Sequence, residues 1–159
     1  MIATPSGRLA QRLALAVPAL LLGGAYLSQY GFGLYPCEMC WWQRYPHFAA
    51  LALALLSTVA APKRLWIMLA ALAVLVSGAI GAFHAGVEYG WWEGVTGCAT
   101  TAGSGSGNAL ENILAAPLIR CDVAPWDLFG VSLAGWNFVC STLGGLSILA
   151  LLARDRKAA

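Results

Sequence analysis

Long apolar stretches without charge alternate with short polar segments along this chain. Three of them carry no Asp, Glu, Lys or Arg: Leu13–Tyr30, Leu65–Val87 and Leu133–Ala153. As a helix, each reaches roughly 27 Å or more, which is close to the thickness of a hydrocarbon core of about 30 Å. The pattern therefore predicts three membrane-spanning helices.

A fourth stretch, Trp41–Ala61, gives a weaker signal, because its firmly apolar part is only Phe48–Ala61. Taken alone, it is typical of a buried or re-entrant helix. The basic residues favour a complete span, because an even number of spans leaves both chain ends on the same side of the membrane. We therefore predict four spans.

The charges are divided between the two faces of this four-span arrangement. Seven of the nine basic residues fall on one face: Arg8, Arg12, Lys63, Arg64, Arg154, Arg156 and Lys157. Six of the seven acidic residues fall on the other. The positive-inside rule then places both termini in the cytoplasm and segment 88–130 outside, as in a protein of a bacterial inner membrane. The first span is too long for a cleavable signal peptide and lacks a small-residue cleavage site.

The predicted fold is all-α: one membrane domain over residues 1–159, a four-helix transmembrane bundle with a long outer, periplasmic loop. Asn108–Ala116 is predicted to form a short helix on the membrane surface, after a flexible Gly/Ser stretch at Gly103–Gly107. The composition, 60% hydrophobic and 10% charged, requires lipid around most of the chain. The net charge of +2 gives no reason to expect a nucleic-acid partner.

Four of the five cysteines fall on the predicted outer face, where oxidising conditions favour disulfide bonds. Cys37 and Cys40 form a Cys-x-x-Cys pair at the start of the second span. Cys98 and Cys121 form a separated pair in the long loop. Cys140 lies within the last span, and we interpret it as a small packing residue.

The first pair has the features of a reactive site. Cys40 lies near the first turn of its predicted helix, where the helix dipole and unpaired N–H groups stabilise a thiolate. Arg44 follows one turn later on the same face, and an arginine at this depth is costly without a partner or a function. A disulfide that closes so short a loop restrains little of the unfolded chain, so redox chemistry explains Cys37 and Cys40 better than a structural role.

The second pair allows two interpretations. A Cys98–Cys121 disulfide is either a structural link that closes the loop or a redox-active bond, and the Gly/Ser stretch inside it fits a mobile loop. His84 lies near the outer end of the third span, where a lone histidine is more often a packing residue than a site. No metal site is predicted, because His47 and His84 are the only histidines and zinc usually takes four ligands.

Two segments resemble the signatures of a known family. The stretch PCEMCWWQRYPH (Pro36–His47) and the stretch CDVAPWDLFG (Cys121–Gly130) are similar to those of the DsbB family of disulfide-bond formation proteins. The order of four spans, Cys-x-x-Cys and outer cysteine pair also agrees, and the resemblance covers nearly the whole chain. The chain departs from the family in being short: between Cys98 and Cys121 its outer loop has little more than the Gly/Ser stretch and one predicted short helix, which leaves little surface to dock a partner.

The resemblance implies a thiol oxidase that reoxidises a periplasmic DsbA-like protein of thioredoxin fold and passes the electrons to a quinone, either ubiquinone or menaquinone. In the implied relay, the partner attacks the Cys98–Cys121 disulfide, most readily at Cys98. Cys121 then attacks Cys37, and Cys40 is freed as a thiolate beside the quinone.

The resemblance also implies the residues that bind the cofactor. Arg44 would hold a quinone oxygen, and His84 would lie near the quinone head because of its position at the end of the third span. Two alternative functions remain. One is an enzyme like vitamin K epoxide reductase, whose active Cys-x-x-Cys usually comes late in the chain. The other is a non-catalytic membrane scaffold whose disulfides are only structural links.

Overall fold

The structure of the protein, a computed structural model, describes residues 4–96, 99–100 and 118–158. These residues form four helices: α1 (Pro5–Gly31), α2 (Glu38–Val59), α3 (Lys63–Glu88) and α5 (Leu133–Ala158). Two short antiparallel strand pairs accompany them: β1 (Ala99–Thr100) with β2 (Leu118–Ile119), and β3 (Asp127–Leu128) with β4 (Val131–Ser132). The predicted all-α bundle is confirmed for these residues, and the predicted surface helix Asn108–Ala116 lies outside them.

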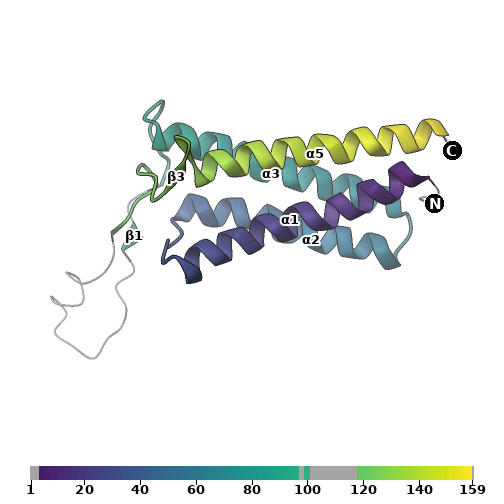
Figure 1. The fold of residues 1–159 in the computed structure, drawn as a ribbon, viewed down its shortest axis with the longest axis horizontal. Helices are drawn as coiled ribbons and strands as arrows, with labels where there is room; N and C mark the ends of the chain where they lie inside the picture. Colours follow the sequence, from purple (N-terminus) through teal and green to yellow (C-terminus); the bar gives the residue numbers. More distant parts are fainter. Residues whose placement is uncertain (1–3, 97–98, 101–117, 159) are drawn as a thin grey trace.

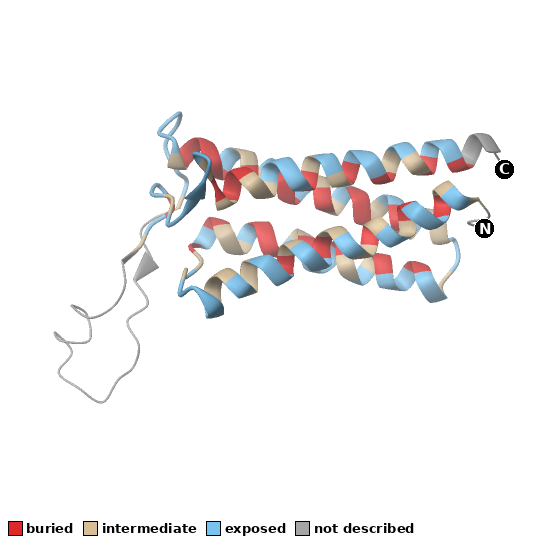
Figure 2. Cartoon of the chain, viewed as in Figure 1, coloured by how far each residue is buried: buried red, intermediate tan, exposed pale blue. Residues whose placement is uncertain are grey.

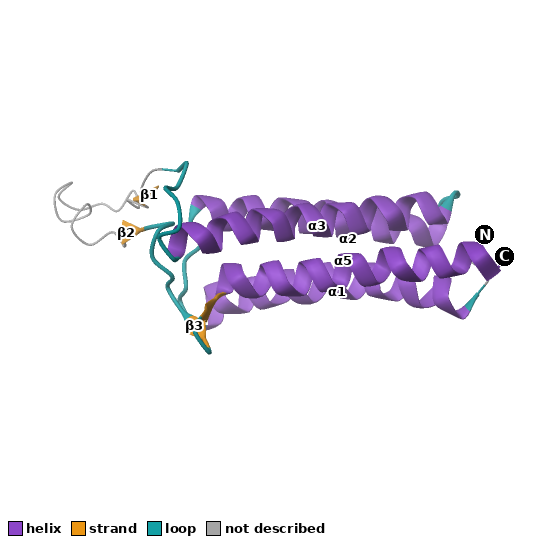
Figure 3. Ribbon diagram, turned by 90° about the horizontal axis from the view of Figure 1, so that it is seen from above, coloured by secondary structure: helices purple, strands orange, loops and turns teal. Residues whose placement is uncertain are grey.

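The helices form an elongated bundle whose two chain ends lie at the same end (Figure 1). Helix α3 packs most extensively against α2 and α5, and α1 packs against α5 and α2. Helices α1 and α3 have few contacts with each other, so they lie on a diagonal of the bundle (Figure 3). The strands, the α1–α2 connection and the segment between α3 and α5 lie at the end opposite the termini, and the short α2–α3 connection lies at the same end as the termini.

Three of the four described helices are long and apolar enough to cross a membrane: α1, α3 and the Leu133–Asp155 part of α5. Helix α2 does not reach this standard, because its first half carries Gln43, Arg44 and His47. This agrees with the weaker signal of Trp41–Ala61 in the sequence, and a span by α2 stays a prediction.

The helices extend beyond the apolar stretches that predicted them. Helix α1 begins at Pro5, well before Leu13, because Thr4 caps it: the Thr4 hydroxyl accepts a hydrogen bond from the Gly7 amide at 3.2 Å. The same hydroxyl donates to the buried carboxylate of Asp155, which also lies 3.8 Å from the Arg64 guanidinium. Polar contacts of this kind join the ends of α1, α3 and α5.

Small side chains let the helices approach closely. The buried core is rich in alanine: Ala10, Ala14, Ala50, Ala54, Ala70 and Ala71 surround Ile67, Val74, Ile148 and Leu152. Figure 2 shows the buried residues on the sides of the helices that face each other. A Cβ added at Gly81 would lie 3.0 Å from the carbonyl oxygen of Ala134, so α3 and α5 could not keep this contact with a larger residue.

A hairpin made by β3 and β4 leads into α5. Its two turn residues, Phe129 and Gly130, have φ angles of 55° and 75°, as a type I′ turn requires. The Asp127 carboxylate accepts a hydrogen bond from the Gly130 amide at 3.2 Å, and the Tyr89 hydroxyl accepts one from the Ser132 amide at 3.0 Å. The second sequence signature therefore builds a turn that is held against the end of α3.

Candidate functional site

The Cys-x-x-Cys pair forms the start of α2. Cys37 is the N-cap residue, and its sulfur accepts a hydrogen bond from the Cys40 amide at 3.3 Å. The two sulfurs lie 2.9 Å apart, so a modest rotation of the side chains brings them to the bonding distance of about 2.05 Å. Cys37 is buried and Cys40 is half-buried. The pair is therefore close enough to form a disulfide.

The two thiols differ in acidity, and both precede the stretch predicted to cross the bilayer, which begins at Trp41. The Cys37 thiol donates a hydrogen bond to Cys40 and is buried, and these two effects raise the pKa of Cys37 to about 12. The same hydrogen bond lowers the pKa of Cys40, although burial opposes the shift. In the reduced protein, Cys40 therefore loses its proton more readily than Cys37.

Arg44 lies one turn after Cys40 and is buried, with 6% of its surface exposed. Its guanidinium donates to the Gln29 side-chain oxygen at 2.7 Å and to the Ala25 carbonyl oxygen at 3.2 Å. It also lies between two aromatic rings, 4.9 Å from the centroid of Tyr26 and 4.8 Å from that of Trp41. These neutral partners leave the positive charge of Arg44 available for an electron-rich ligand.

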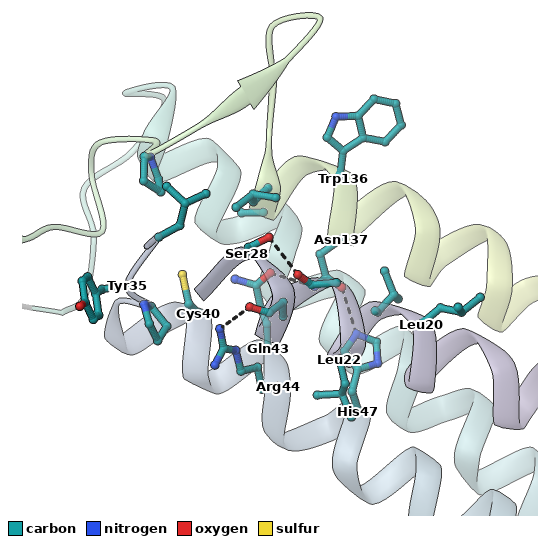
Figure 4. Close-up of a pocket in the computed structure, with 18 residues that line it drawn as sticks. Leu20, Leu22, Ser28, Tyr35, Cys40, Gln43, Arg44, His47, Trp136 and Asn137 are labelled. Atoms are coloured by element: carbon teal, nitrogen blue, oxygen red, sulfur yellow. Dashed lines mark hydrogen bonds between the residues drawn. The ribbon is translucent and has the colours of Figure 1, made fainter. Parts of the chain in front are cut away.

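A cavity of about 240 Å³ has both Cys40 and Arg44 in its lining. It is lined by residues of α1, α2 and α5, together with the segment that follows α1. Its walls are mostly apolar, and the polar groups gather on α2 and α5, among them Gln43, His47 and Asn137 (Figure 4). A cavity of about 150 Å³ holds benzene in another protein, so this one has room for a single substituted ring.

A second cavity of about 260 Å³ also has Cys40 in its lining. It is lined by Cys37, Cys40, His84 and Glu88, with residues of the loop that carries Cys121. His84 is among the residues that line this cavity and not the one that Arg44 lines. The structure thus places His84 beside the sulfur atoms, and the position near a quinone head that the resemblance implied stays a prediction.

Cys121 lies against the Cys-x-x-Cys pair. It is buried in a cluster with Cys37, Met39 and Val87, and burial raises the pKa of its thiol. The sulfurs of Cys37 and Cys121 and one ring nitrogen of His84 all lie within 4.8 Å of one another. Three of the four predicted catalytic cysteines are therefore together, and the fourth, Cys98, lies outside the described residues.

This cluster fits sulfur exchange better than metal binding. Zinc usually takes four tetrahedral ligands, and Zn–S bonds of about 2.3 Å place two bound sulfurs about 3.7 Å apart. Cys37, Cys121 and His84 provide three ligand atoms. Cys40, the nearest candidate for a fourth, has its sulfur only 2.9 Å from that of Cys37.

Sequence reasoning missed several buried polar residues around the site. Gln43 and His47 were noted only as part of the first signature or as possible metal ligands, and Asn137 was not noticed at all. The structure connects them: Asn137 donates to Gln43 at 2.8 Å and contacts His47 at 3.0 Å. The signal that could have revealed them is an amide side chain in a stretch predicted to lie within lipid, where a polar group is costly without a function.

Comparison with known proteins gives a consistent answer. Residues 7–152 match the family described as disulfide bond formation protein DsbB. The chain is similar to disulfide bond formation protein B of Verminephrobacter eiseniae, with 36% identity over 92% of this chain and 86% of the relative. It is also similar to the proteins of the same name from Acidovorax sp. strain JS42 (31% identity; 99% and 94% covered) and Polaromonas sp. strain JS666 (34%; 91% and 90%). No solved structure matches the chain.

Proposed function

Because this chain belongs to the DsbB family of disulfide-bond formation proteins, we propose that it is a membrane oxidoreductase that passes electrons from a periplasmic dithiol protein to a quinone. The dithiol protein is expected to be DsbA-like, with a thioredoxin fold. One observation carries the proposal: Cys40 borders two cavities, one with Cys37 and the loop of Cys121, the other with Arg44. A sulfur in this position can receive electrons on one side and deliver them on the other.

The cavity beside Arg44 fits a quinone head. A quinone is a flat apolar ring with two electron-rich oxygens, and the cavity combines apolar walls with the buried guanidinium of Arg44. A charged donor in a site that excludes water binds the negative charge that develops on such an oxygen during reduction. When bound, the quinone supplies the acceptor for two electrons and two protons.

The sulfur relay follows from the positions of three cysteines. After the partner's thiolate has opened a Cys98–Cys121 disulfide at Cys98, Cys121 carries the displaced electron pair as a thiolate. It attacks the Cys37 sulfur, the Cys37–Cys40 bond breaks, and the electron pair leaves on Cys40. The short distance between the Cys37 and Cys121 sulfurs supports this step.

The relay then returns to its starting state. The partner's second thiolate attacks the bond that joins the partner to Cys98, so the partner leaves as a disulfide and the electron pair stays on Cys98. Cys98 then attacks Cys121, and the Cys37–Cys121 bond breaks with its electron pair on Cys37. The Cys37 and Cys40 sulfurs would then give two electrons to a quinone held beside Cys40 and Arg44, and the bond between these sulfurs would re-form. Two thiol protons from the partner balance the two protons of the quinol.

We also propose the predicted topology, with four spans in a bacterial inner membrane and both termini in the cytoplasm. The basic residues at the ends of α1, α3 and α5 support it, because they gather at the end of the bundle that holds both termini (Figure 1). Lipid contact with the exposed apolar side chains of the helices is part of the same proposal. Examples are Leu20, Val59 and Leu143, which are more than half exposed.

The test is turnover by the purified protein in detergent, with a reduced DsbA-like protein and a water-soluble quinone, followed by the loss of quinone absorbance. We expect quinone reduction in the wild type and none in Cys40→Ser. A scaffold predicts no reduction in either protein. An enzyme like vitamin K epoxide reductase is less consistent with the family match and with the early position of the Cys-x-x-Cys pair.

A further inference from the structure

A chain of buried polar side chains crosses the bundle beside the cysteines. The Gln43 amide nitrogen lies 2.8 Å from the His84 Nδ1 atom, and the Gln43 oxygen accepts a hydrogen bond from the Asn137 amide at 2.8 Å. The Asn137 oxygen in turn lies 3.0 Å from the His47 Nε2 atom. The chain thus joins α3, α2 and α5 in a part of the bundle where each group must satisfy its hydrogen bonds internally.

Two backbone carbonyl groups fix the orientation of the two amides. The Gln43 nitrogen also donates to the Met39 carbonyl oxygen at 3.2 Å, and the Asn137 nitrogen donates to the Ser77 carbonyl oxygen at 3.2 Å. Rotating either amide by half a turn would place its oxygen against a carbonyl oxygen, which can only accept. The two orientations also agree with each other, because the Asn137 nitrogen then faces the Gln43 oxygen.

This orientation fixes the position of the hydrogen on the His84 ring. Since Gln43 presents an N–H group to Nδ1, that atom must supply its lone pair, and the hydrogen of the neutral ring is on Nε2. Nε2 lies 3.6 Å from the Cys37 sulfur and 3.7 Å from a carboxylate oxygen of Glu88. His84 is therefore a donor that points between a sulfur and a carboxylate.

We propose that Gln43 is a positioning residue that holds His84 as an N–H donor toward Cys37, so that His84 stabilises the Cys37 thiolate each time a bond to this sulfur breaks. The inference rests on the proposed function, because Cys37 becomes a thiolate when Cys121 leaves it. The electron pair of the broken Cys37–Cys121 bond stays on the Cys37 sulfur. The His84 Nε2 atom, 3.6 Å from that sulfur, can then donate its hydrogen to it until Cys37 rejoins Cys40.

The same arrangement excludes the opposite role for His84. A base that removes the Cys37 proton through Nε2 needs a free lone pair on that atom, and a metal ligand needs the same. Both would require a hydrogen on Nδ1, opposite the Gln43 N–H group. Glu88 lies beside this donor: its side chain is 2% exposed, and one of its carboxylate oxygens is 3.7 Å from Nε2.

Nitrogen NMR of the protein labelled with ¹⁵N-histidine, in detergent and without quinone, shows directly which ring nitrogen of His84 carries the hydrogen. The chain has two histidines, so the His47→Gln variant assigns the His84 signals. We expect His84 with its hydrogen on Nε2 and a bare Nδ1. A bare Nε2 with the hydrogen on Nδ1 overturns the inference.

The role of the donor is tested by two replacements of His84. In His84→Gln, the amide nitrogen can take the place of Nε2–H, whereas His84→Leu has no donor. We expect the rate of Cys37 alkylation in the reduced protein at one fixed alkaline pH, read by mass spectrometry, to fall about 10- to 100-fold in His84→Leu, the loss expected for a hydrogen bond to a charged group. His84→Gln should stay near the wild type. Equal losses in both variants would show that His84 does not act as a donor.

The role of Gln43 is tested by Gln43→Leu in two backgrounds. With His84 present, turnover should fall about tenfold, because nothing then keeps the hydrogen of the His84 ring on Nε2. With His84→Gln present, Gln43→Leu should have little further effect, since a glutamine side chain has no ring hydrogen whose position Gln43 could fix. An equal loss in both backgrounds means that Gln43 only supports the packing of the bundle. The NMR and alkylation results do not depend on quinone, so they can stand even if the wild type fails to reduce it.

Discussion

The sulfur of Cys121 lies within 4.8 Å of the sulfur of Cys37, although the two residues belong to an outer loop and to the cap of a helix. Both are buried. The relay therefore does not need a large movement of this loop to bring Cys121 to its target. The close approach makes the Cys37–Cys121 disulfide a species that can be isolated.

We predict that Cys40→Ser accumulates a Cys37–Cys121 disulfide. Without Cys40, Cys37 loses its partner in α2, and Cys121 is the nearest remaining thiol in the described part of the chain. Digestion under non-reducing conditions and mass spectrometry would identify the linked peptides. Cys140→Ser is the matched control, because Cys140 is exposed on α5, and it should give the wild-type pattern. If the two peptides stay unlinked in Cys40→Ser, the proposed step between these sulfurs is wrong.

The acidity of the two α2 cysteines predicts a pH dependence of labelling in the reduced protein. Only the thiolate reacts, and a raised pKa moves reactivity to higher pH. Cys37, with its pKa raised to about 12, should react slowly near neutral pH and accelerate only at strongly alkaline pH. Cys40, with its lowered pKa, should react first. Iodoacetamide labelling followed by peptide mass spectrometry measures both rates, and faster labelling of Cys37 near neutral pH would contradict the assignment.

Arg44→Ala should weaken quinone use much more than thiol exchange. It removes a charged hydrogen-bond donor from the cavity, which is worth about 1.5–3 kcal/mol, so the quinone KM should rise about tenfold or more. Exchange with the reduced partner, measured without quinone, should stay within about twofold of the wild type because Arg44 is not among the residues lining the cavity that holds Cys37. Arg12→Ala, exposed on α1, is the control. An unchanged quinone KM would remove Arg44 from the site.

Gly81→Ala should destabilise the bundle by about 1–3 kcal/mol, because overpacking a close contact costs this much. The new Cβ would lie 3.0 Å from both the Ala134 carbonyl oxygen and the Asn137 amide nitrogen. Gly23→Ala in α1 is the control, since a Cβ there meets nothing within 4 Å. Thermal unfolding in detergent measures both variants. Equal Tm values would mean that α3 and α5 do not pack as closely as described.

The helices could be predicted from the sequence because a bilayer helix needs a long apolar stretch, and the chain shows such stretches plainly. Their ends could not, because they depend on caps such as Thr4 and on polar contacts such as that of Asp155. The β3–β4 hairpin was also missed. Its turn places Phe129 at a positive φ angle, where a turn of this type usually has Asn or Asp. The usual Asn-Gly or Asp-Gly motif is therefore absent, and the hairpin could not be recognised from the sequence.

The position of Arg44 beside Cys40 followed from helical spacing, because both residues lie on one helix. The surroundings of His84 could not follow in the same way. Its depth in the bundle is set by its place along α3, but the side it faces depends on how α3 is rotated against α2. The contact of Gln43 with Asn137 depends likewise on the packing of α2 and α5, which apolar periodicity alone does not determine.

A single-turnover experiment tests the central claim most directly. The fully reduced protein in detergent is mixed with a water-soluble quinone, quinol is followed by absorbance, and the disulfides formed are identified by mass spectrometry. The account predicts one quinol for each Cys37–Cys40 disulfide, and no quinol from Cys40→Ser. Quinol formation by Cys40→Ser at the wild-type rate, or oxidation of the cysteines without any quinol, would contradict it.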